Sequence, residues 1–154
     1  MLNRYAFRIV FAVFALLALA LAYNFSTARN DHARIEPEVF APYFTALNEG
    51  RFAQAWAFHT EGWRGRHPEA EFTEFYTKLL AKEGPIDSRV WYGSNRLGLP
   101  WLGAPGTAVD YQIYLKRSFY SISFTVVPDP DGRFLIDRGV ATNGNMRMEN
   151  DLPW

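Results

Sequence analysis

Hydrophobic and polar residues follow three successive patterns along this chain. Residues 9–23 are an unbroken apolar run, and a polar stretch follows it. Between residues 37 and 82, apolar residues recur at spacings of three and four, which is typical of helices with one buried face. Beyond residue 88, apolar and polar residues alternate, which is typical of half-buried strands. The pattern therefore predicts an apolar segment, then helices, then a β-sheet.

The apolar run has the composition of a helix that enters a membrane. Arg4 and Arg8 precede it, and basic residues favour the cytoplasmic side, so the rest of the chain is expected on the far side. The side chains expected to contact lipid are the large apolar ones: Ile9, Val10, Phe11, Phe14, Leu16, Leu17, Leu19 and Leu21. In a bacterium, this arrangement makes a single-pass inner-membrane protein with a cytoplasmic N-terminus and a periplasmic domain.

Two interpretations of this segment remain open. As a retained anchor, the run falls short of the ~20 residues that cross a bilayer, although residues 5–7 extend it. As a signal peptide, it would be removed near Ala28, after the small residues Ser26 and Thr27, and the domain would be secreted to the periplasm. We take the retained anchor as the leading interpretation.

The rest of the chain divides into predicted helices and strands. Helices are expected at residues 37–48, 51–59 and 68–82, because Gly50 and the Gly84-Pro85 pair suit helix ends. Strands are expected at residues 88–93, 107–117, 119–127 and 133–140, with a hairpin turn at residues 116–118. These elements form one domain over residues 36–141. Residues 24–35 are expected to be a stalk, and residues 142–154 a mobile or partner-docking tail.

The order of these elements is also that of a known superfamily. The stretch YFTALNEGRFAQAWAFHTE resembles the first helical hairpin of the nuclear transport factor 2-like (cystatin-like) superfamily, in which an Ala-Trp pair enters the core; Ala55 and Trp56 match it. GTAVDYQIYLKR and DPDGRFLIDRGV resemble strands of an exported bacterial subgroup of uncharacterised function. The resemblance covers residues 36–140 and implies an α+β cone, with three helices packed on a curved four-stranded antiparallel sheet. That superfamily includes enzymes, adaptors and assembly modules, so the fold implies no single function.

Charge and composition exclude several classes of function. Net charge is zero, and without Arg4 and Arg8 the chain has fourteen basic against sixteen acidic residues, which argues against nucleic-acid binding. The absence of cysteine excludes disulfides and thiol catalysis. His32, His59 and His67 lack the spacing of metal ligands, so no metal or other cofactor is expected.

The inward face of the predicted sheet offers little for catalysis. Burial of apolar area is expected to turn these residues inward: Val109, Tyr111, Ile113, Leu115, Tyr120, Ile122, Phe124 and Val126. No carboxylate lies among them, so a general acid or base is not expected there. The weak catalytic candidates are His59 and Tyr111, with Tyr120 as an alternative partner for His59. We favour a structural His59 that bonds the last carbonyl groups of its helix.

Two segments and the tail are candidates for partner binding. Trp63, Arg64 and Arg66 lie in an expected loop and suit anionic lipid headgroups or an acidic protein patch; alternatively, Trp63 packs into the core. Residues 97–106 carry no charge, and Leu97, Leu99, Trp101 and Leu102 either pack on the sheet or form a contact site. Trp154 is the corresponding candidate in the tail.

Three functions remain compatible with these observations. The first is a non-catalytic, membrane-anchored accessory or assembly subunit that binds membrane lipid and a larger membrane protein complex, with respiratory or photosynthetic assemblies as examples. The second is a periplasmic domain that binds a small apolar ligand between Trp56, Phe75, Tyr111 and Tyr120. The third is a lyase or isomerase that uses His59. We expect the first, and so expect that the chain is not an enzyme.

Overall fold

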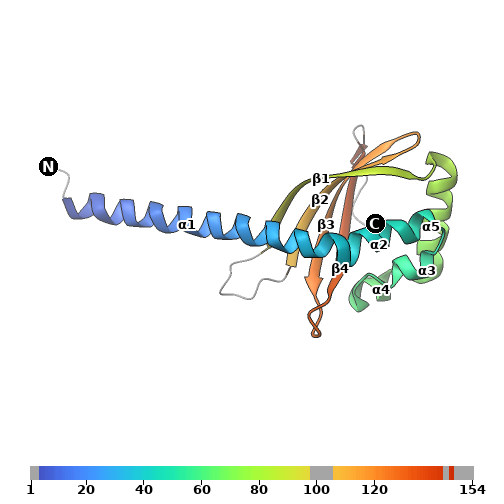
Figure 1. The fold of residues 1–154 in the computed structure, drawn as a ribbon, viewed down its shortest axis with the longest axis horizontal. Coiled ribbons are helices and arrows are strands. Elements are labelled where there is room, and N and C mark those ends of the chain that lie inside the picture. The colour runs from blue at the N-terminus through green and yellow to red at the C-terminus, as the bar shows by residue number, and fades with distance from the viewer. Residues whose placement is uncertain (1–3, 98–105, 144–145, 148–154) are drawn as a thin grey trace.

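The computed structural model describes residues 4–97, 106–143 and 146–147. Helices come first and strands follow, so the chain is an α+β protein with a long apolar N-terminal helix (Figure 1). The helices are α1 (Arg4–Ile35), a π-helical turn η1 (Glu36–Phe40), α2 (Ala41–Asn48), α3 (Phe52–Trp56), α4 (Glu61–Arg66) and α5 (Glu69–Glu83). After α1, the described part therefore has more helical elements than the three that the sequence predicted to follow the apolar segment.

The helical N-terminal part runs without interruption from α1 through η1 to α2. Pro37 and Pro42 lack the N–H group that an α-helix needs at each interior position. The chain stays helical because η1 widens at this point: the Ala41 N–H donates to the Glu36 carbonyl, five residues earlier. The expected helix at residues 37–48 is thus the end of a longer rod. Residues 24–35, expected to be a separate stalk, are the last third of α1.

The sheet is an antiparallel meander. Its strands are β1 (Ile86–Leu97), β2 (Gly106–Leu115), β3 (Phe119–Pro128), β4 (Phe134–Asn143) and the two-residue β5 (Met146–Arg147), in the spatial order β1-β2-β3-β4-β5. The four long strands match the four expected ones, although β1 is longer at both ends. Tyr114 pairs with Phe119, which confirms the predicted hairpin.

The core lies between the helical rod and the inward face of the sheet. All eight residues predicted to face inward on β2 and β3 are buried. Phe40 packs against them, with ring centroids 4.9 Å from Tyr111 and 5.0 Å from Phe124. The hydroxyls of Tyr43 and Tyr76 are 2.9 Å apart, and burial raises the pKa of both phenols. This pairing satisfies two polar groups that would otherwise destabilise an apolar interior.

The helices that follow α2 and precede β1 along the chain agree in part with the sequence pattern. The expected helix at residues 68–82 is α5, which ends at Gly84 with a φ of 86°. However, α4 lies where a loop was expected, and the Thr60 hydroxyl caps it by accepting a bond from the Trp63 N–H. Trp56 is only partly buried against the core, and its indole N–H donates to the His67 carbonyl at 2.8 Å.

Phe124 and Phe119 lie on the same strand and allow a direct test of the core. Phe124 is fully buried, whereas Phe119 is 41% exposed. We expect Phe124→Ala to lower the free energy of unfolding by about 3–5 kcal/mol, because it leaves a cavity. Phe119→Ala should lower it by less than about 1 kcal/mol. Urea unfolding of the full chain in mild detergent measures both, and equal losses would contradict this sheet register.

Candidate functional site

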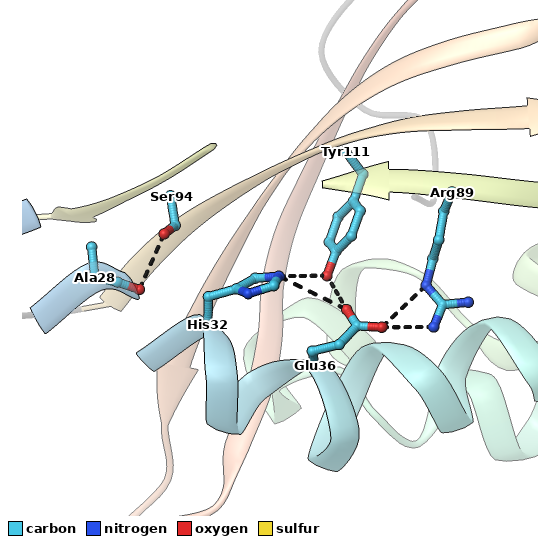
Figure 2. A network of polar contacts seen from close by, with 6 residues as sticks. All are labelled: Ala28, His32, Glu36, Arg89, Ser94 and Tyr111. Carbon is cyan, nitrogen blue, oxygen red and sulfur yellow. Dashed lines mark hydrogen bonds and ion pairs between the residues drawn. The ribbon is translucent and has the colours of Figure 1, made fainter. Parts of the chain in front are cut away.

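Polar side chains meet where the end of α1 crosses the inward face of the sheet. His32 and Glu36 are one helical turn apart, so their side chains share a face of the helix. Tyr111 comes from the inward face of β2, and its register partner is Trp91 of β1. Arg89 lies two residues before Trp91, on the same face of β1. Figure 2 shows the His32, Glu36, Arg89 and Tyr111 side chains converging there.

The Glu36 carboxylate is at the centre of this cluster. Its Oε1 accepts hydrogen bonds from Arg89 Nη2 at 2.6 Å and Nε at 3.3 Å. Its Oε2 accepts a hydrogen bond from the Tyr111 hydroxyl. The Glu36 and Arg89 side chains are each only 29% exposed, so solvent screens this pair less than a surface ion pair. The carboxylate thereby connects the helix to two neighbouring strands.

His32 is the fourth member of the cluster, and its contacts determine which ring nitrogen carries hydrogen. Its Nε2 is 3.1 Å from the Tyr111 oxygen and 4.0 Å from Glu36 Oε2. Because the Tyr111 hydroxyl donates its only hydrogen bond to Glu36, the Nε2 of His32 carries hydrogen and donates to the tyrosine oxygen. The imidazole also stacks on Trp91, with ring centroids 4.2 Å apart.

Burial determines the protonation of His32 and Tyr111. It lowers the pKa of His32, and the nearby Glu36 carboxylate opposes this shift only in part. Burial also raises the pKa of Tyr111, and the hydrogen bond to Glu36 raises it further. At neutral pH the imidazole and the phenol are therefore both neutral.

Two further hydrogen bonds attach the preceding turn of α1 to the sheet. The Ser94 hydroxyl donates to the Ala28 carbonyl at 3.1 Å, and the Thr107 hydroxyl donates to Asp31 Oδ2 at 3.0 Å. Ala28 is fully buried, and its small side chain lets the helix approach β1 closely. We call the six residues in Figure 2 the helix–sheet junction: Ala28, His32, Glu36, Arg89, Ser94 and Tyr111.

The junction contains histidine, glutamate and tyrosine, which are residue types of proton-transfer sites, but these side chains bond to one another and to Arg89. Tyr111 donates to Glu36 and accepts from His32, while Glu36 is held by Arg89. The bonds that the junction forms therefore hold α1 on β1 and β2. Within the described residues, no group of three or more His, Asp or Glu side chains has the geometry to hold a metal ion.

His59 lies in a separate environment from Tyr111. It is fully buried, its ring stacks on Trp63 at a centroid distance of 3.8 Å, and its Nδ1 is 3.2 Å from the Trp56 carbonyl. Trp56 is the last residue of α3, so this is the structural role that we favoured for His59. Among the described residues, the hydroxyl of Tyr111 bonds to His32 and Glu36 rather than to His59.

The structure separates the residues proposed for partner binding. Trp63 is 3% exposed, so it belongs to the core and not to an exposed aromatic surface. Arg64 lies over the Trp56 ring at 5.1 Å, and Arg66 is exposed at the end of α4. Leu97 is half-buried at the end of β1. Leu99, Trp101, Leu102 and Trp154 lie outside the described residues.

The large apolar residues of the N-terminal run are all exposed. Their exposed fractions range from 50% at Val13 to 68% at Phe11. The helical stretch Arg8–Asn48 contains an 18-residue window with a mean hydropathy of 2.2 and no buried residue, so it is long and apolar enough to cross a membrane.

Sequence reasoning did not find the helix–sheet junction. His32 and Glu36 have visible i, i+4 spacing, but they were placed in or beside a stalk. Arg89 and Tyr111 are 53 and 75 residues away from Glu36 along the chain. The spacing of the polar residues within residues 28–36 was the only local signal of this site. That Arg89 and Tyr111 are the partners of Glu36 becomes visible only in the folded chain.

We expect Glu36→Gln to destabilise the domain more than Glu38→Gln. Glu36→Gln removes the charge that pairs with the half-buried Arg89, and the loss should be about 1.5–3 kcal/mol. Glu38 is 48% exposed and 3.8 Å from Arg34, so its replacement should change stability by about 0.5 kcal/mol or less. Urea unfolding in mild detergent gives both values. Similar losses would show that the Glu36 contacts add nothing specific.

His32 should make the domain less stable in acid. Its folded pKa is below the ordinary value of 6.5, so the unfolded chain binds the additional proton first. This contribution to stability is complete above about pH 6.5 and is lost as the pH falls through the folded pKa. The melting temperature should fall more between about pH 7.5 and about pH 5.5 in the natural chain than in His32→Gln. An NMR titration midpoint for His32 above 6.5 would contradict the expected direction.

Comparisons with known proteins do not assign this chain to a family. No protein-family model matches this chain, and no curated protein sequence matches it.

Proposed function

We propose that this chain is a membrane-anchored accessory or assembly subunit. It holds an α+β domain in a fixed orientation beside a membrane, where the domain binds a larger membrane protein complex and catalyses no reaction. In a bacterium, the anchor lies in the inner membrane, the N-terminus is cytoplasmic and the domain is periplasmic. Arg4 and Arg8, before the apolar run, support this orientation.

The observation that carries the proposal is the continuity of α1. Residues 9–23 of α1 expose every large apolar side chain, whereas Ala28 and Ile35 near the C-terminal end of α1 are fully buried. Contiguous apolar surface of this extent is unfavourable in water and favourable in a bilayer. A single helix thus joins a lipid-compatible surface to the domain core without a flexible linker. The orientation of the domain follows from that of the membrane helix.

The burial of Ala28 supports a retained anchor over a cleaved signal peptide. The Ala28 carbonyl accepts the Ser94 hydroxyl, and the surrounding backbone is helical. Cleavage after Ala28 would remove this turn, and its hydrogen bond with Ser94, from the domain. Cleavage there would also separate the apolar run from the helix–sheet junction.

The packing of the inward sheet face supports a binding role over a ligand pocket or an active site. The rings of Phe40 and Phe44 lie 4.9 and 6.1 Å from that of Tyr111, and Tyr120 is only 3% exposed. Helices followed by an antiparallel sheet also support our proposal that the domain is a nuclear transport factor 2-like cone. The surfaces proposed for the complex are the anchor, the segment that begins at Leu97, and the tail.

The continuity of α1 can be tested by inserting a short Gly/Ser linker between Asn24 and Phe25. We expect the C-terminally tagged natural chain to resist extraction from membranes by carbonate and to co-purify with other membrane proteins in mild detergent. The linker variant should remain in the membrane and keep its melting temperature but lose those partners, because the domain is no longer held in one orientation.

A linker of the same length inserted after Gly132, in the turn between β3 and β4, is the matched control. It should leave co-purification unchanged. Equal recovery of partners with both variants would contradict the need for a continuous helix. Recovery of the natural chain as a lone, cleaved, soluble monomer would contradict the proposed function as a whole.

A further inference from the structure

A groove lies between α1 and β1, on the side of the helix–sheet junction nearer to the apolar run. Its volume is about 560 Å³, within the range of pockets that hold small molecules. One wall comes from α1 and the other from β1, and its main side chains are Ser26, Arg29, Asn30, Trp91, Tyr92 and Asn95. Figure 1 shows β1 descending beside α1 toward the exposed part of the helix.

We propose that this groove binds the headgroup of an anionic phospholipid from the bilayer that α1 enters. The inference rests on the membrane anchorage proposed above. It adds a ligand class and a set of residues that anchorage alone does not require.

The position of the groove along α1 matches the depth of the headgroups. The apolar run ends at Tyr23, and Ser26 and Asn30 follow three and seven residues later. At 1.5 Å per residue, they lie roughly 5–10 Å beyond the run. The headgroup layer on each side of a bilayer is about 5–8 Å thick. A helix that crosses the membrane therefore places the groove among headgroups.

The chemistry of the groove suits a phosphate group. Arg29 supplies a guanidinium, whose geometry matches two phosphate oxygens. Asn30, Asn95 and Ser26 add amide and hydroxyl donors around it. No Asp or Glu side chain is among the described residues that line the groove, so a phosphate would meet no carboxylate there.

Two adjacent aromatic residues form the edge of the groove on β1. The register of β1 against β2 shifts between Trp91 and Gly93, and Trp91 and Tyr92 both line the groove beside this irregularity. Tyr92 is 62% exposed and Trp91 is 37% exposed. Tryptophan and tyrosine are the residues that concentrate at membrane–water interfaces.

The two walls are already held together without a ligand. The hydrogen bond from Ser94 to Ala28 and the stacking of Trp91 on His32 join β1 to α1 beside the groove. Binding therefore requires little ordering of the protein, which favours recognition by few contacts.

The experiment measures lipids retained by the full chain. The protein is placed in nanodiscs that contain phosphatidylglycerol and phosphatidylcholine, then released and examined by native mass spectrometry. We expect retained phosphatidylglycerol, with little phosphatidylcholine, because only the former keeps a net negative charge for Arg29. In Arg29→Gln the retained fraction should fall roughly tenfold, which corresponds to about 1.4 kcal/mol.

Two further variants make the result specific. Asn30→Glu introduces a negative charge at an exposed helical position in the groove and should abolish retention without unfolding the domain. Arg34→Gln removes an exposed arginine of the same helix outside the groove and should leave retention unchanged. Equal retention by the natural chain, Arg29→Gln and Asn30→Glu would overturn the proposal.

Two other outcomes would also overturn it. Equal retention of phosphatidylcholine would show that the negative charge is not recognised. Displacement of the lipid by soluble glycerol phosphate at matched concentration would assign the groove to a free anion.

Carbonate extraction of the same variants keeps this proposal distinct from the proposed function. Loss of the lipid with normal membrane retention concerns the groove alone. Extraction of the natural chain from the membrane would instead contradict anchorage.

Discussion

The half-buried carboxylate of Glu36 is the interaction on which the arrangement of this protein depends. A charge removed from water is tolerated only where hydrogen bonds and an opposite charge replace the solvent. Arg89 and Tyr111 meet that requirement, one from each of two neighbouring strands. Satisfying Glu36 therefore sets the rotation of α1 about its axis and its position along the sheet. The same rotation buries Ala28 and Ile35 and brings Asp31 within reach of Thr107.

The junction turns an apolar helix into a rigid support for the domain. Because α1, η1 and α2 form one helical rod, the exposed apolar residues and the core residues that this rod contributes lie on one continuous helix (Figure 1). The proposed function and the proposed lipid groove both follow from this continuity. The first uses the fixed orientation of the domain, and the second uses the fixed height of β1 above the apolar run. Neither would follow if a flexible stalk joined the helix to the domain.

Much of the fold was predictable because its signals are local. The alternation on β2 and β3 identified the eight apolar residues of the inward face, since a strand with one buried face must place apolar groups at every second position. The Gly84 signal and helical spacing likewise located α5 closely. The docked end of α1 was missed because it meets the sheet through Ala28 and polar bonds, without the large apolar stripe that marks an amphipathic helix. α4 was missed because its six residues are too few to show a period, although Thr60 is a recognisable cap.

The candidate site could be predicted only in part, for the same reason. Sequence alone placed Tyr111 on the inward face and indicated that His59 bonds the end of its helix. It also determined the apolar run, the charges beside it and the order of helices before strands, because these depend on residues close together in the chain. Tertiary structure alone decided that Glu36, Arg89 and Tyr111 meet, that Trp63 is buried, and that a groove opens beside Arg29. Those outcomes depend on contacts between residues more than fifty positions apart or on the packing of several elements, for which no local pattern exists.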